Sequence, residues 1–234
     1  MSQWESDLTF RACLERVEWE IRRLTSRESE WNRANQQTRA SQDSSSRADR
    51  AFTFIFLAGT LEDLFRELNQ SLPRDLQHLE LHRHDLRPTA LSLLVPDAWD
   101  AISGDRVARI VRRRDLVATA NEFHASTDVL ELGAIKQLGV HDGRTVNVHH
   151  FEALWEGLCL AGPTASVWPS PQHRTAIVTL ADKRNTIAHF ETDPRDEAFR
   201  FTYGDLRLLA ARVLESVERL HEYTIVWMDR HRKN

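Results

Sequence analysis

The segment that decides the fold is AFTFIFLAGTLEDLFREL, residues 51–68. Its first half is apolar on nearly every side, and charged residues enter only in its second half. A helix that is hydrophobic around its whole circumference belongs in the interior of a protein. We therefore expect a central core helix from about residue 47 to residue 70, and we expect the sequence SLPRD, residues 71–75, to end it.

Two further segments carry apolar residues at helical spacing. In residues 4–30 one apolar stripe recurs at intervals of four and three on an otherwise charged helix. The members of this stripe are Phe10, Leu14, Val17, Ile21 and Leu24. After Thr202 a second stripe continues for about six turns. Thr202 and Asp205 form a variant of the capping box that begins helices, so this last helix is the clearest in the chain.

The rest of the sequence completes an all-α bundle with an up-and-down course. Helices are expected at 148–160 and 173–190, and Pro194 is expected to stop the second of them, since the residue before a proline disfavours helix. The Ser-rich stretch 35–46 is expected to be an exposed polar loop.

A single domain spanning residues 1–234 accommodates these elements. Within it, residues 73–146 are expected to form an inserted, mostly helical subregion. The helices expected in this insertion lie at 105–123 and 127–138.

Composition narrows the class of protein. With 41% hydrophobic and 28% charged residues the chain resembles a soluble globular protein. Its net charge of −4 would not drive it onto nucleic acid, so a polyanion would need a local basic patch. Cys13 and Cys159 form neither a C-x-x-C pair nor a disulfide framework. Without a signal region or a membrane-length apolar run, the chain is expected to be cytoplasmic and not to contact a membrane.

The segment LADKRNTIAHF, residues 180–190, places three polar side chains among small and apolar neighbours. Asn185 and His189 are four residues apart on the expected helix and share a face. Arg184 lies about 140° from His189 around the axis, but its long side chain can reach the same cleft. This combination is typical of a site that handles phosphate.

An arginine followed five residues later by a histidine is not informative alone, because a chain so rich in arginine produces the pair by chance. It occurs twice, as Arg144 with His149 and as Arg184 with His189. The first pair spans a β-branched run after Gly143, where no helix would order both groups, and is interpreted as coincidence.

The sequence RNTIAH, residues 184–189, resembles the signature of the HEPN superfamily, whose ribonucleases carry an arginine, an adjacent polar residue and a histidine shortly afterwards. The flanking sequences LADKRNTIAHFETDP and FTYGDLRLLAARVLESVERLHEY are similar to the ends of toxin and defence proteins of this superfamily. FLAGTLEDLFREL is similar to their core helix, in which an acidic residue often stands at the position of Glu62. The resemblance covers residues 47–72 and 148–228.

The resemblance implies a HEPN-like helical bundle and a metal-independent endoribonuclease without a cofactor, acting as a toxin or antiphage defence effector on cellular or invading RNA. Arg184 would stabilise the phosphate transition state and His189 would transfer protons. Asn185 would support one or both, and Glu62 would orient a group in the pocket. The products would be a 2′,3′-cyclic phosphate and a 5′-hydroxyl.

One histidine per chain is one short for a reaction with two proton transfers, so a homodimer with a composite active site is expected. Some HEPN toxins carry a tyrosine two residues after the histidine, which a partner nucleotidyltransferase modifies. Glu191 occupies that position here, so no such antitoxin is assigned. An antitoxin or defence-system partner of another kind stays an open expectation.

Alternatives to the nuclease interpretation stay open. A histidine late in a helix interacts favourably with the helix dipole, and Arg184 can pair with Glu62 or Asp182 in a purely structural role. In the adaptor alternative, a non-catalytic helical protein binds a nucleotide or a partner protein and uses the trio only for contacts.

The basic sequence DRVARIVRRRDL has two interpretations. Its arginines form either a solvated helix face or a phosphate-binding patch that guides RNA and binds less tightly as salt rises. The arginines on one face are Arg106, Arg109 and Arg113.

A cluster of histidines in HLELHRH is interpreted as fortuitous, because no third ligand or acid is fixed by its spacing, and no metal site is predicted. Its members are His78, His82 and His84. The sequence has no glycine-rich phosphate loop, nucleophile elbow or H-E-x-x-H motif, which excludes P-loop enzymes, α/β-hydrolases and common zinc proteases.

Overall fold

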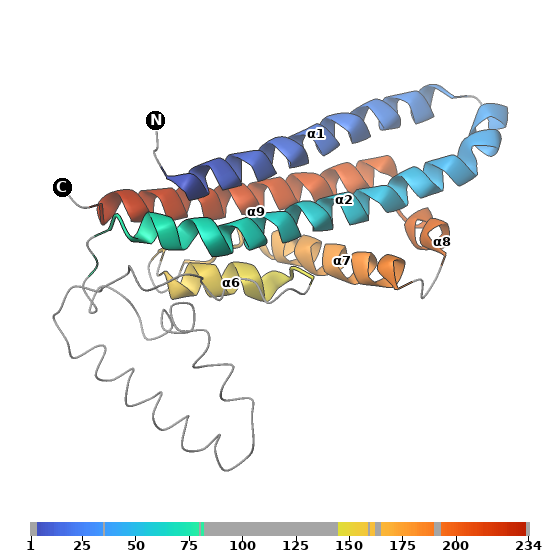
Figure 1. Ribbon diagram of the computed structural model, residues 1–234. Coiled ribbons are helices and arrows are strands. Elements are labelled where there is room, and N and C mark those ends of the chain that lie inside the picture. Colours follow the sequence, from blue (N-terminus) through green and yellow to red (C-terminus); the bar gives the residue numbers. More distant parts are fainter. Residues whose placement is uncertain are drawn as a thin grey trace, which may run out of the picture.

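The computed structural model describes residues 4–34, 36–79, 81, 145–158, 160–161, 165–189 and 193–232. Over these residues the fold is all-α, as predicted (Figure 1). The helices are α1 (Glu5–Arg33), α2 (Gln36–Leu76), α6 (Val148–Gly157), α7 (Pro171–Ala188), α8 (Pro194–Phe199) and α9 (Tyr203–Arg230). None of these helices combines the length and the apolar character needed to cross a lipid bilayer.

Three long helices form the main layer of the bundle. α1 runs antiparallel to α2, and α9 packs along both, so that the start of α1 and the end of α9 lie at the same end of the bundle (Figure 1). The predicted stripes of α1 and α9 point inward, where Phe10, Val17, Val213 and Leu220 are fully buried. The predicted capping box of α9 is confirmed by the Asp205 N–H, which donates to Thr202 Oγ1 at 3.1 Å.

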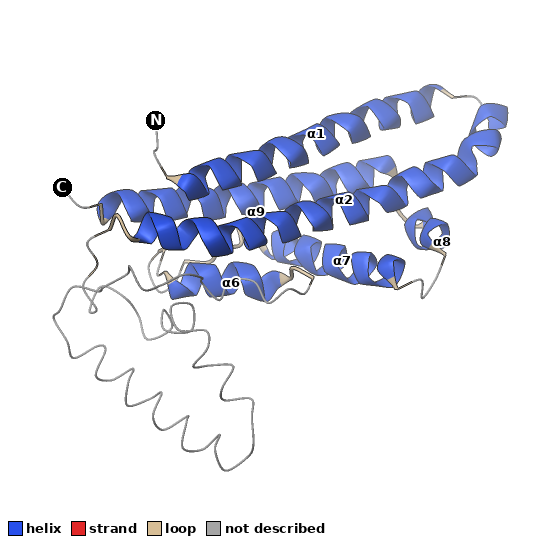
Figure 2. Cartoon of the chain, in the orientation of Figure 1, coloured by secondary structure: helices blue, strands red, loops and turns tan. Residues whose placement is uncertain are grey.

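The central helix lies where the sequence placed it, but it is longer at both ends. The expected polar loop at 35–46 is wrong, because α2 is continuous from Gln36 (Figure 2). Two contacts favour helix over loop in this polar stretch. Asp43 and Arg47 form an ion pair one turn apart, and the buried Ser46 hydroxyl lies 3.1 Å from the Tyr203 hydroxyl on α9.

The expected end of this helix at SLPRD is also wrong, since Pro73 lies inside α2 and the helix continues to Leu76. Asp75 in this last turn has a partner on another helix. Its carboxylate accepts hydrogen bonds from the backbone N–H groups of Glu5 at 2.9 Å and Ser6 at 2.8 Å, at the start of α1. Trp4, the N-cap residue of α1, makes no side-chain cap, so Asp75 satisfies free donors there and ties the two helix ends together.

A second layer lies on α2 and consists of α6, α7 and α8 (Figure 1). The expected helices at 148–160 and 173–190 are confirmed with small shifts of their ends. α8 was not expected, because Pro194 was interpreted only as the end of the preceding helix. Proline is also favourable at the first position of a helix, and the Asp193 side chain accepts the Arg195 N–H at 2.8 Å and caps α8.

Most of the predicted insertion 73–146 lies outside the described residues. The helices expected at 105–123 and 127–138 fall there, as do the arginines Arg106, Arg109 and Arg113. These expectations stay predictions.

Candidate functional site

The predicted motif occupies the last turn of α7, where that helix lies against the middle of α2. Arg184 points toward Glu62, and its Nη2 atom lies 3.2 Å from Glu62 Oε1 and 3.4 Å from Oε2. Both side chains are half-buried, with 28% and 24% of their surface exposed. The structure therefore brings together two residues that are far apart in the sequence and that the sequence had singled out separately.

Asn185 shares this contact. Its Oδ1 atom accepts a hydrogen bond from Thr145 Oγ1 at 2.8 Å and a longer one from Arg184 Nη1 at 3.4 Å. With Oδ1 committed to these donors, the side-chain N–H₂ group of Asn185 is the part that can donate to a ligand oxygen. Thr145 was not singled out from the sequence, since it lies just before α6 in a stretch without a motif.

His189 stands immediately after α7 as its C-cap residue. Its backbone N–H still donates to the Asn185 carbonyl at 3.0 Å, so the two residues stay one helical turn apart as predicted. The imidazole is exposed. An exposed imidazole is accessible to a ligand that arrives from solvent and can exchange a proton with it.

The charge of the site is nearly balanced before any ligand binds. The Arg184 guanidinium faces a carboxylate, and the neighbouring Lys183 is paired with Glu197 on α8. A phosphate would therefore compete with Glu62 for the guanidinium, which has donors on more than one nitrogen. The arrangement therefore offers donors to one phosphate group, and contacts with neighbouring phosphates of a longer chain would have to come from other residues.

The other histidines singled out in the sequence do not join this site. His149 is largely exposed on α6 and lies 3.4 Å from Glu152, while Arg144 is outside the described residues. His78 is exposed near the end of α2, and His82 and His84 are likewise not described. Among the residues placed by the structure, no three His, Cys, Asp or Glu side chains gather as metal ligands would.

One chemically suggestive group was missed in the sequence. Ser170 Oγ lies 2.8 Å from His173 Nδ1, and His173 Nε2 lies 2.6 Å from Glu215 Oε2 on α9. These residue types occur in nucleophilic triads. Here Ser170 is the N-cap residue of α7 and His173 its third helical residue, so the group closes the first turn and joins α7 to α9. We interpret it as structural.

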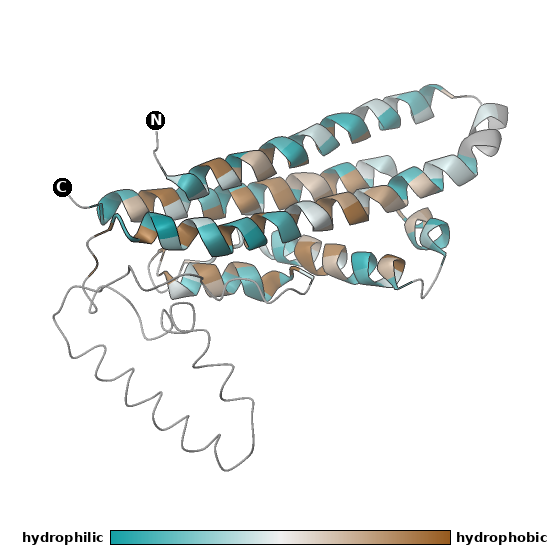
Figure 3. Ribbon diagram, in the orientation of Figure 1, coloured by the Kyte–Doolittle hydropathy of each residue, from teal (hydrophilic) through white to brown (hydrophobic). Residues whose placement is uncertain are grey.

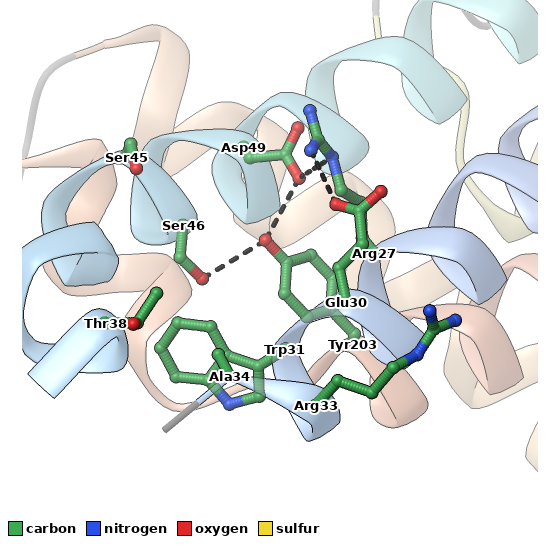
Figure 4. A pocket seen from close by; sticks show the side chains of 10 residues that line it. All are labelled: Arg27, Glu30, Trp31, Arg33, Ala34, Thr38, Ser45, Ser46, Asp49 and Tyr203. Atoms are coloured by element: carbon green, nitrogen blue, oxygen red, sulfur yellow. Dashed lines mark hydrogen bonds and ion pairs between the residues drawn. The ribbon is translucent and has the colours of Figure 1, made fainter. Parts of the chain in front are cut away.

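A cavity of about 530 Å³ lies near the start of α2, between the end of α1 and the start of α9. Figure 4 shows Tyr203 at its centre, with its hydroxyl bonded to Ser46 and Asp49 at 3.1 Å each. Burial raises the pKa of the Tyr203 phenol. Asp49 also pairs with Arg23 and Arg27. The polar groups on the floor of this cavity therefore satisfy one another.

Cys13 is excluded as a nucleophile. It lines a smaller cavity of about 350 Å³ between α1 and α2, but only 3% of its surface is exposed. Burial raises the pKa of its thiol to about 12. The reactive thiolate is therefore scarce at neutral pH.

No family model, curated protein or solved structure matches this chain. The site on α7 is therefore interpreted from its own geometry and from the resemblance of its motif.

Proposed function

We propose that this protein is a metal-independent endoribonuclease of HEPN type and that its active site is the last turn of α7. The observation that carries the proposal is the clustering of Arg184, Asn185 and Glu62 beside an exposed His189. A helix held only by packing does not require this set of side chains. The resemblance of the RNTIAH motif supplies the reaction.

The proposed reaction is an internal transesterification of RNA. A ribose 2′-hydroxyl loses its proton and its oxygen attacks the adjacent phosphorus, while the bond from phosphorus to the 5′-oxygen breaks. The 5′-oxygen takes up a proton, which leaves a 2′,3′-cyclic phosphate and a 5′-hydroxyl. Water and a metal ion are not reactants in this step.

Each side chain has a role that follows from its chemistry. His189 moves protons because a neutral imidazole accepts a proton at one ring nitrogen and an imidazolium donates one. Arg184 donates from its guanidinium to the phosphate as negative charge builds up. Asn185 donates its amide N–H₂ to a phosphate oxygen, and Glu62 holds Arg184 in place from α2.

Two proton transfers require a second proton-transfer group besides His189. A homodimer that places two copies of the α7 turn across one cleft would supply it. The biological role that goes with this proposal is that of a toxin or antiphage effector, together with an antitoxin or defence-system partner.

The adaptor alternative also has an observation in its favour. Glu62 already neutralises the charge of Arg184. An arginine that is paired in this way can still donate hydrogen bonds to a nucleotide or a partner protein without taking part in a reaction. The two functions differ in whether RNA is cut.

Analysis of reaction products tests the proposal. Purified protein should cut single-stranded RNA in the presence of a metal chelator and leave 2′,3′-cyclic phosphate and 5′-hydroxyl ends. Products with 5′-phosphate ends, or cleavage that stops on chelation, would contradict it. Nucleotide binding that is lost in Arg184→Ala, without any cleavage by wild type, would establish the adaptor instead.

A further inference from the structure

We infer that the outward face of α2 is the surface on which a second copy of this chain docks. The inference rests on the proposed function only where it gives that second copy a part in RNA cleavage. The face consists of six residues, which we name the α2 strip: Ala48, Phe52, Ile55, Gly59, Glu62 and Arg66.

The α2 strip lies between two neighbouring helices. On one side α1 reaches α2 through Arg16 and Asp63, whose charged atoms are 2.9 Å apart, and through the rings of Trp19 and Phe56, whose centroids are 5.3 Å apart. On the other side α7 reaches Glu62 through Arg184. The strip between these contacts faces outward, since most of its residues are exposed. Figure 3 shows hydrophobic residues in the middle part of α2.

Large apolar side chains are exposed on and beside the strip. Phe52 is 47% exposed, Ile55 38% and Trp19 48%. The rings of Phe52 and Phe56 are 5.8 Å apart, which joins Phe52 to the ring contact with Trp19 in one patch. A contiguous exposed apolar patch of this kind marks an interaction site on a soluble protein.

Gly59 indicates that the approaching element comes close to the backbone. Glycine weakens the middle of a helix relative to alanine, and a Cβ atom added at Gly59 would meet nothing within 4 Å in its own chain. The packing of the described residues therefore gives no reason for a glycine at this point. A helix from outside that crosses α2 near Gly59 would give one, because the distance between two packed helices depends on the side chains at their contact.

Spacing and charge favour a second copy over a polyanion. The strip residues alternate in steps of four and three, which is the spacing of a seam between two helices. Around them Arg16 and Arg66 are balanced by Asp63 and Glu67, so single-stranded RNA would find no excess of positive charge.

A two-fold axis near Gly59 makes the strip complementary to itself. Phe52, whose ring centroid lies 5.6 Å from the Arg23 guanidinium of its own chain, then comes level with the partner subunit's Arg66. The two Glu62 residues come to about 9 Å from each other along the helix axis, at 1.5 Å per residue. Because Arg184 is paired with Glu62 in each chain, both copies of the proposed site lie at the edge of the interface between the two α2 helices.

Sedimentation of wild type and strip variants tests this inference. Gly59→Arg is the main variant, because the space around Gly59 is open and the folded monomer accommodates the new side chain. Ile55→Asp is the second, and Leu208→Arg is the control, since Leu208 is 51% exposed on α9. We expect wild type and Leu208→Arg to have the mass of two chains at micromolar concentration. Both strip variants should have the mass of one chain and an unchanged helical circular dichroism spectrum.

Two results would overturn the inference: strip variants that stay dimeric, or a monomeric wild type. If the monomeric protein binds RNA and Phe52→Ser weakens this binding, the strip is an RNA-binding surface instead. The mass measurement does not depend on RNA cleavage. Failure of the docking inference can therefore be distinguished from failure of the proposed ribonuclease activity. A dimer that dissociates as expected but cuts no RNA contradicts only the nuclease assignment. Undiminished cleavage by monomeric Gly59→Arg contradicts only the part that the second copy plays in the site.

Discussion

Arg184 on α7 and Glu62 on α2 form an ion pair whose Nη2 and Oε1 atoms are 3.2 Å apart. The contact joins the helix that carries the RNTIAH motif to the central helix of the core. Both side chains are about one-quarter exposed, so solvent screens the pair and its contribution to folding stability is at most about 1 kcal/mol. We therefore interpret Glu62 as a residue that positions Arg184 rather than one that stabilises the fold.

Replacing Glu62 separates these two roles. Glu62→Ala should lower kcat for RNA cleavage about 10-fold with little change in KM, since the guanidinium loses its orientation but not its charge. Glu62→Gln should restore most of the rate, because its amide oxygen still accepts from Arg184. Steady-state kinetics measure both effects. Glu152→Ala, which breaks the similar pair with Arg174 on α7, serves as the control. Wild-type kinetics in Glu62→Ala would rule out a positioning role.

The cap of α9 offers a test of the fold. Thr202→Ala removes the acceptor of the Asp205 N–H and should lower the free energy of unfolding by about 1 kcal/mol. Urea denaturation measures this change. Thr25→Ala makes the same substitution in the interior of α1, where the hydroxyl only donates to the Ile21 carbonyl. It should leave stability nearly unchanged, and an equal loss in both variants would argue against the capping role.

Asp7 on α1 should make the stability of the protein depend on acid pH. Burial alone would raise the pKa of its carboxyl group, but hydrogen bonds from Arg11 at 3.0 Å and His221 at 2.7 Å outweigh burial and hold the pKa below its ordinary value of 3.8. The unfolded chain therefore binds the proton more readily than the folded one. The resulting stabilisation is complete above about pH 4 and is lost as the pH falls through the folded-state pKa.

This pH dependence can be measured by urea denaturation at a series of acid pH values. Asp7→Asn should flatten the fall in the free energy of unfolding below about pH 4. Asp229→Asn is a suitable comparison, because Asp229 also lies on a helix of the main layer but is more than half exposed. A slope that is the same in Asp7→Asn as in wild type would show that Asp7 does not carry the effect.

The sequence predicted the parts of the fold that local pattern determines. The stripe of α1 is visible in the chain because this helix buries one face from Ser6 to Leu24, and the stripe of α9 because its buried face runs from Tyr203 to Met228. The Thr202 cap is visible because its two residues are three positions apart. The start of α2 was missed because its residues Ser44, Ser45 and Ser46 are typical of loops. One of the two contacts that favour helix there, the bond between Ser46 and Tyr203, is a tertiary contact that no local pattern contains.

The candidate site likewise contains residues that the sequence predicts and residues that only the packing of the helices reveals. Arg184, Asn185 and His189 could be selected from the sequence because they share one helical turn. The pairing of Arg184 with Glu62 was left as one of two structural possibilities beside Asp182, since only the packing of α7 on α2 decides between them. Thr145 and the α2 strip carry no recognisable motif, and their positions follow from the arrangement of the helices alone.

The most direct test of the central claim is the rate of cleavage of end-labelled single-stranded RNA in the presence of a chelator. Wild type and His149→Ala, which removes an exposed histidine elsewhere on the surface, should cut at the same rate. His189→Ala and Arg184→Ala should each be slower by about 100-fold or more, with unchanged helical content. Failure of wild type to cut any RNA, or equal rates for His189→Ala and wild type, would contradict the assignment of this site as a ribonuclease.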